Sequence, residues 1–188
     1  MFGIPYCGAD ICGYFNLPSE NMCLRWMQMG AFYPFSRNHN GDFSGEQDPA
    51  LWDNVAEASR RALTIRYWFL PYLYTLHYEA HREGSTVVRP LLAEFPTDLV
   101  ARGVDDQFLW GSYLLISPVI TETPLDSRRA HFPAARWYNY YTRGMEFEGP
   151  TTTDLFVPLF DIPVHIRGGG ILPMQEPAAN TMLRSVQV

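Results

Sequence analysis

The chain has 188 residues, of which 47% are hydrophobic, enough for one good-sized domain or two small ones with a substantial core. Its net charge is −6, all 14 basic residues are arginine and no basic run occurs, which argues against a nucleic-acid partner. No apolar stretch approaches the roughly 20 residues that span a bilayer, and no signal peptide is visible at the first residues.

The chain opens on an apolar segment that predicts a short buried strand over residues 3–7, followed by a loop between Gly8 and Gly13. Because the sequence starts inside a strand-like segment, we expect a piece of a longer protein. A helix is expected from Ser19, which can cap it, with Glu20 in the favourable first turn. The apolar side chains at helical spacing are Met22, Trp26 and either Met29 or Ala31.

A second helix is predicted to begin at Asp48, as the cap, and Pro49, as the first helical residue. Before it, Pro34 argues against a regular central strand. Pro71 should kink or break the long helix, and its second piece should end at Gly84. The apolar face of the first piece consists of Leu51, Val55, Ala58, Ala62, Ile65 and Phe69.

After Gly84 the pattern changes to clusters of β-branched and aromatic residues between Pro, Gly and Asp turns. We place a domain boundary near residue 86, with a β-loop-α unit repeated twice before it and an all-β, antiparallel region after it. The segments that predict strands are residues 86–95, 112–120, 135–142, 155–159 and 162–174.

Three cysteines stand at positions 7, 12 and 23, too few for a disulfide scaffold and without the spacing of a zinc site. Two readings stay open at this point. All three are buried thiols, or one bridge joins Cys12 to Cys23 and leaves Cys7 free.

Two strand-loop-helix units match the closing part of a (β/α)8 barrel, in which functional residues lie at the carboxyl ends of the strands. Asp10 and His39 each fall at such an end and are candidate site residues. The alternatives are a turn or helix-cap role for Asp10 and a plain surface loop for His39. Trp26 or Phe35 could add an apolar wall, although core packing is favoured for both.

Long ordered stretches of the sequence resemble glycoside hydrolase family 31. They include GIPYCGADICGYF at residues 3–15, the segments at 23–40 and 66–98, ARWYNYYTRG at 135–144 and VHIRGGGILPMQEPAANT at 164–181. The resemblance implies an α/β plus all-β chain. Residues 1–86 would be the last β/α units of a (β/α)8 TIM barrel, 87–168 a proximal antiparallel β-sandwich, and 169–188 the start of a distal β-domain.

The resemblance also implies the activity, a retaining α-glucosidase acting on non-reducing α-linked glucose. The family's two catalytic aspartates lie in motifs that this sequence lacks, so we expect the isolated chain to be inactive. The resemblance assigns substrate binding to Asp10, His39 and Tyr14, with an α-glucosidic oligosaccharide and the N-terminal part of the same enzyme as partners. It implies the secretory pathway, and no metal or cofactor. The alternative is a truncated, non-catalytic chain that binds carbohydrate or another partner.

Other signals are given ordinary structural roles. His77 and His81 stand four apart on a helix, but no third metal ligand is in view. The aromatic run at residues 137–141 could bind a sugar, although cross-strand packing is favoured.

Overall fold

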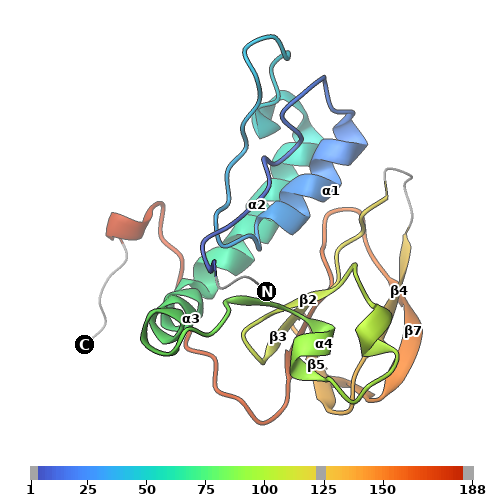
Figure 1. Cartoon of the computed structure of the whole chain (residues 1–188). Helices are drawn as coiled ribbons and strands as arrows, with labels where there is room; N and C mark the ends of the chain where they lie inside the picture. The colour runs from blue at the N-terminus through green and yellow to red at the C-terminus, as the bar shows by residue number, and fades with distance from the viewer. Residues whose placement is uncertain (1–3, 122–125, 184–188) are drawn as a thin grey trace.

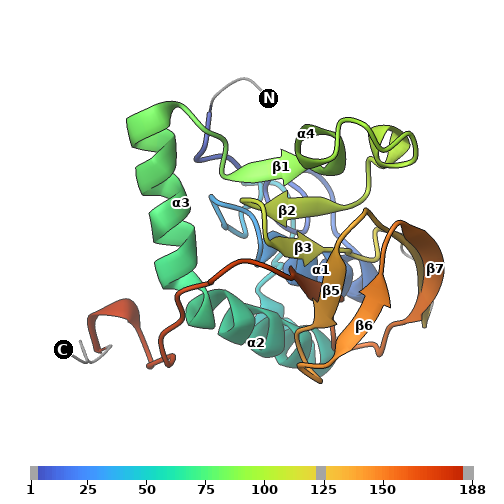
Figure 2. The same ribbon diagram turned by 90° about the horizontal axis from the view of Figure 1, so that it is seen from below.

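The computed structural model describes residues 4–121 and 126–183. Three α-helices form one side of the molecule, and two antiparallel sheets form the other (Figure 1). The segment before η3 (Thr181–Leu183) returns to the helices, where the Gln175 amide donates to the Trp68 carbonyl at 3.1 Å (Figure 2). Within the described ranges, no helix is both long and apolar enough to span a membrane.

Helix α1 (Glu20–Gly30) begins as predicted, because the Ser19 hydroxyl accepts a hydrogen bond from the Met22 amide at 3.2 Å. The predicted apolar face is wrong at Met22, while Ala31, one of the two alternatives for its last position, is fully buried. Met22 is exposed, and Trp26 and Met29 are only half-buried. The helix packs on α2 through the adjacent stripe of Cys23, Leu24 and Met27, and Gly30 contacts Ile11.

The predicted strand at residues 3–7 is absent over the described residues 4–7, and Gly3 lies outside the described ranges. Residues 7–11 instead run beside residues 35–38 with two backbone hydrogen bonds and a single parallel bridge, Ile11 to Asn38. A strand assignment needs a longer ladder than this pair of segments makes.

The second predicted helix is interrupted at Trp52 and again at Phe69. Asp48 caps a short 3-10 helix, η1 (Pro49–Leu51), and α2 (Asp53–Trp68) begins after the extended residue Trp52. Leu51 is therefore exposed, while the rest of the predicted apolar face is buried. Pro71 stands in the first turn of α3 (Leu70–Glu83), and Gly84 ends that helix in the left-handed conformation at φ 70°.

The larger sheet is antiparallel and has the order β1-β2-β3-β8-β5-β6. Its strands are β1 (Val88–Pro90), β2 (Phe108–Trp110), β3 (Leu114–Ile116), β5 (Arg136–Asn139), β6 (Met145–Glu148) and β8 (Val164–Arg167). A second antiparallel pair consists of β4 (Ser127–Phe132) and β7 (Thr151–Phe156). The all-β, antiparallel prediction is confirmed apart from three short helices in the described part of this region, α4 (Leu91–Glu94), η2 (Ala101–Gly103) and η3.

Several strand predictions differ from the structure. The segment 86–95 is strand only at Val88–Pro90, because Leu91 begins α4. The prediction at 155–159 meets only the end of β7. Strands β2, β4 and β6 were not predicted. β4 and β6 carry charged residues that hide the pattern, among them Arg128, which is buried because it pairs with Asp106 at 2.9 Å.

A single hydrophobic core joins the helices to the larger sheet. Trp110 of β2 is fully buried, its indole Nε1 donates to the Phe32 carbonyl at 2.6 Å, and the Tyr72 hydroxyl donates to the Trp110 carbonyl at 2.9 Å. A second core, which includes Leu109, Leu115, Phe132 and Trp137, lies between the two sheets. The first core continues across residue 86, where the composition changes, and the domain boundary there stays a prediction.

Candidate functional site

The candidate site is built on two backbone segments that lie side by side over α1 and α2 (Figure 1). The Phe35 amide donates to the Cys7 carbonyl and the Ile11 amide to the Arg37 carbonyl, both at 3.0 Å. Gly8 permits this approach, because a Cβ built there would lie 1.9 Å from the Phe35 carbonyl oxygen. Residues 7–11 and 35–38 are therefore fixed next to each other.

The bridge residues Ile11 and Asn38 face the helices. Ile11 is buried against Gly30 of α1, where a Cβ would lie 2.4 Å from the Ile11 side chain. Side chains alternate along extended backbone, so their neighbours Asp10, Arg37 and His39 turn toward the opposite, open face. Arg37 and His39 are exposed and Asp10 is half-buried, in agreement with this alternation.

Asp10 forms an ion pair with Arg37, whose Nη2 lies 3.2 Å from Oδ1. An ion pair this exposed contributes little to stability, so its main effect is to orient the carboxylate. Beside it, the rings of Tyr14 and His39 have centroids 5.4 Å apart. Within residues 4–121 and 126–183, no hydrogen bond joins Asp10 directly to His39. The structure brings Tyr14 and His39 together, and it connects Asp10 to the same segment through Arg37.

The side-chain amides of Gln47 and Asn38 hold both segments from the side opposite the open face. Gln47 is almost fully buried, and its Nε2 donates to the carbonyls of Ile11 and Gly13 at 3.2 Å and to Asn38 Oδ1 at 2.9 Å. The Asn38 amide donates back to the Gln47 carbonyl at 3.1 Å. Arg37, Asn38 and Gln47 are site residues that the sequence pattern did not predict, and no local signal distinguishes a buried Gln47 from its polar loop neighbours.

The turn that follows Asp10 is fixed to α1 by a disulfide between Cys12 and Cys23, with Cα atoms 4.7 Å apart. Of the two readings of the cysteines, the bridged one is present, and Cys7 is an exposed free cysteine. Cys12 and Gly13 both have positive φ, 69° and 89°, which bends the chain sharply from Asp10 toward Tyr14. Trp26 packs under this turn, close to Gly13.

The open face therefore offers a carboxylate, an imidazole and a phenol ring. A carboxylate accepts strong hydrogen bonds and a neutral imidazole both donates and accepts, which suits a hydroxyl-rich ligand. Two carboxylates near these segments in the sequence have other roles. Glu20 accepts from Asn54 at 2.9 Å, and Asp48 caps η1. Among residues 4–121 and 126–183, no group of three side chains could hold a metal ion.

Comparisons with known proteins match both parts of the chain. Residues 1–76 match the Glycosyl hydrolases family 31 TIM-barrel domain, and residues 84–172 match the Glycosyl hydrolase family 31 C-terminal domain. The chain is 54% identical over 182 residues to the human protein described as "Probable maltase-glucoamylase 2", with 96% of this chain covered and 7% of that protein.

It is also 46% identical over 184 residues to the alpha-glucosidase of Mucor javanicus, covering 94% of this chain and 21% of the relative. Its fold superposes on a crystal structure of the glucosidase II alpha subunit, bound to Glc1Man2, with a TM-score of 0.87 and 31% identity. That match covers 93% of this chain and 19% of the other. The chain thus spans about a fifth or less of the length of these proteins.

Proposed function

Because the chain belongs to glycoside hydrolase family 31, we propose that it is the C-terminal piece of a retaining α-glucosidase that hydrolyses terminal, non-reducing α-linked glucose. In this proposal, residues 1–86 complete a (β/α)8 barrel with its last β/α units. Residues 87–168 form the proximal β-sandwich, and residues from 169 on begin a distal β-domain. The two antiparallel sheets and the core between them support the sandwich.

The observation that carries the proposal is the placement of the Asp10–Arg37 ion pair and the Tyr14–His39 ring contact on one open face. In this assignment, Asp10 and His39 form hydrogen bonds with the glucose hydroxyls. The Tyr14 ring makes an apolar contact with the sugar. Arg37 orients Asp10. Asn38 and Gln47 hold the two segments at the spacing that this requires.

Retaining hydrolysis needs a nucleophilic carboxylate and a protonated carboxyl group about 5–5.5 Å apart. The family motifs that supply them are absent from this sequence. The chain's own contribution is therefore binding, and the preceding part of the enzyme, which carries the aspartate pair, is its partner. The Cys12–Cys23 disulfide fits an oxidising compartment, which supports a place in the secretory pathway.

A chimera tests the assignment. Residues 1–188 replace the matched segment of the Mucor javanicus alpha-glucosidase, and maltose hydrolysis is measured. We expect an active chimera in which Asp10→Asn or His39→Ala lowers kcat/KM by about 10- to 100-fold, the effect of losing a charged or well-placed hydrogen bond. Glu46→Gln is the control, since this exposed carboxylate lies on the loop that follows His39.

Wild-type kinetics in both variants of an active chimera would contradict the roles of Asp10 and His39. The isolated chain provides a second test, because maltose hydrolysis by residues 1–188 alone would contradict the expected inactivity. Binding of maltose without turnover is the result that the proposal predicts.

A further inference from the structure

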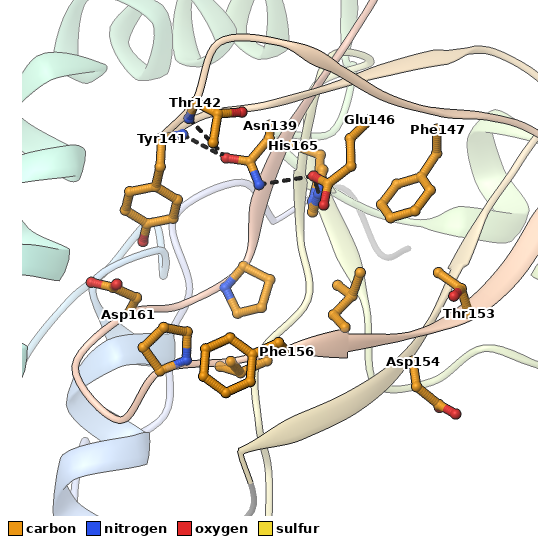
Figure 3. A pocket seen from close by; sticks show the side chains of 14 residues that line it. Asn139, Tyr141, Thr142, Glu146, Phe147, Thr153, Asp154, Phe156, Asp161 and His165 are labelled. Atoms are coloured by element: carbon orange, nitrogen blue, oxygen red, sulfur yellow. Dashed lines mark hydrogen bonds and ion pairs between the residues drawn. The ribbon is translucent and has the colours of Figure 1, made fainter.

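A pocket of about 440 Å³ opens between the two sheets (Figure 3), and its lining includes neither Asp10, Tyr14 nor His39. One wall comes from β5, β6 and β8, and the other from β7 and the segment that follows it. This volume lies within the range of small-molecule sites.

One wall holds a carboxylate in a fixed orientation. Glu146 Oε2 accepts from Asn139 Nδ2 at 2.8 Å and from His165 Nε2 at 2.9 Å, as the dashed lines in Figure 3 show. Asn139 is fixed in turn, because its Oδ1 accepts from the amides of Tyr141 and Thr142. Within the described ranges no hydrogen bond reaches Glu146 Oε1, so this oxygen stays available as an acceptor.

His165 supplies the second observation. Its side chain is 2% exposed and borders the pocket, and its Nδ1 has no hydrogen-bond partner among the described residues. Burial lowers the pKa of the His165 imidazole, although the hydrogen bond to Glu146 opposes that effect. A neutral ring that donates from Nε2 leaves Nδ1 bare but buried, so His165 serves the pocket by holding Glu146 in place.

The opposite wall presents an aromatic ring to solvent. Phe156 of β7 is 75% exposed, although nothing in the β7 ladder requires a large apolar side chain on that face. Tyr141 stands across from it, and its hydroxyl donates to the Ile162 carbonyl at 2.8 Å, which fixes the ring. The faces of such rings suit the C–H faces of a sugar.

We propose that this pocket is a second carbohydrate site, which binds a gluco-oligosaccharide away from the Asp10–His39 site. The identity of the sugar as α-linked glucose rests on the proposed function. The pocket combines acceptors on Glu146 with hydroxyls on Thr142 and Thr153, the mixture that a polyol needs. A metal ion is less suited, because among the described residues no group of three His, Cys, Asp or Glu side chains could hold one.

Titration of the 188-residue chain with maltotriose, followed by ¹⁵N-correlation NMR, tests the proposal. The side-chain amides of Asn139 and Asn38 report on the second and first sites, respectively. We expect saturable shifts at Asn139 with a Kd of the order of 1 mM, weakened about five- to tenfold by Phe156→Ala. Tyr74→Ala is the matched control, since this exposed ring on α3 lies outside the pocket and should leave the Kd unchanged.

The double variant Asp10→Asn/His39→Ala separates this proposal from the function proposed above, because it should remove shifts at Asn38 and leave those at Asn139. Glu146→Gln should weaken binding at Asn139 while circular dichroism confirms an intact fold. Absence of Asn139 shifts would overturn the proposal. A Kd unchanged by Phe156→Ala would also overturn it. So would larger shifts at Asn139 with tetramethylammonium than with maltotriose, because the pocket would then prefer an organic cation to a sugar.

Discussion

Gln47 is the side chain whose hydrogen bonds hold the two site segments together. Substitution by Ala leaves the carbonyls of Ile11 and Gly13 and the Asn38 side chain without a buried donor. We expect Gln47→Ala to lower the free energy of unfolding by about 1–3 kcal/mol, the cost of unsatisfied buried polar groups, as measured by urea denaturation. In the active chimera, KM for maltose should rise as well.

Glu46→Ala is the matched control for that substitution, since the neighbouring side chain is exposed and should change stability by less than about 0.5 kcal/mol. Equal effects of the two substitutions would show that the Gln47 amide does not position the segments.

Residue-level prediction from sequence succeeded where the physical signal is local. Ser19, Asp48 and Gly84 were assigned as helix ends because each acts on groups within four positions in the chain. Gln47 and Arg37 were missed because their partners lie 36 and 27 residues away. For Asp10, Tyr14 and His39, the sequence predicted the residues, and their roles stay predictions.

At the scale of elements, Gly8 sets how closely the two site segments approach. A methyl group at this position would overlap the Phe35 carbonyl, so the backbone must separate and the Cys7–Phe35 hydrogen bond must lengthen. We expect Gly8→Ala to destabilise the chain by about 1–3 kcal/mol and to raise KM in the chimera. Thermal and urea unfolding measure the first effect, and maltose kinetics the second.

Gly103→Ala provides the comparison for Gly8→Ala, since open space surrounds the position of its Cβ. A stability change within about 0.5 kcal/mol is expected there. If Gly8→Ala behaves the same way, the close approach of the segments is not a constraint.

The elements themselves were predicted unevenly for physical reasons. The helices carry a long apolar stripe, so α2 and α3 and the break between them follow from the sequence. Strands β1, β2 and β3 have only three residues each, too few for an alternation to repeat. The β1–β2–β3 region depends on pairing across the sheet and on burial of both faces, which a local pattern does not contain.

At the scale of the whole molecule, the core around Trp110 couples the helices to the larger sheet. Its indole packs against the Phe32 ring in this core and donates the hydrogen bond to the Phe32 carbonyl. We expect Trp110→Ala to lower the free energy of unfolding by about 3–5 kcal/mol. The urea midpoint should fall equally for the backbone amides of α2 and of β8. Residue-resolved NMR during urea titration measures both midpoints.

Persistence of α2 signals after those of β8 are lost would contradict that coupling. Trp68→Ala is the control, because this half-buried ring lies outside the Trp110 cluster and should have a smaller effect on both midpoints.

The shared Trp110 core also limits how related genes can recombine. A crossover near residue 84, between the two matched segments, would place the sheet of one parent against helices inherited from the other. The recombinant protein would fold only where both parent sequences carry side chains that pack with Phe32, Phe69 and Trp110. Exchange of both matched segments together preserves these contacts. We therefore expect the two segments to be inherited as one unit.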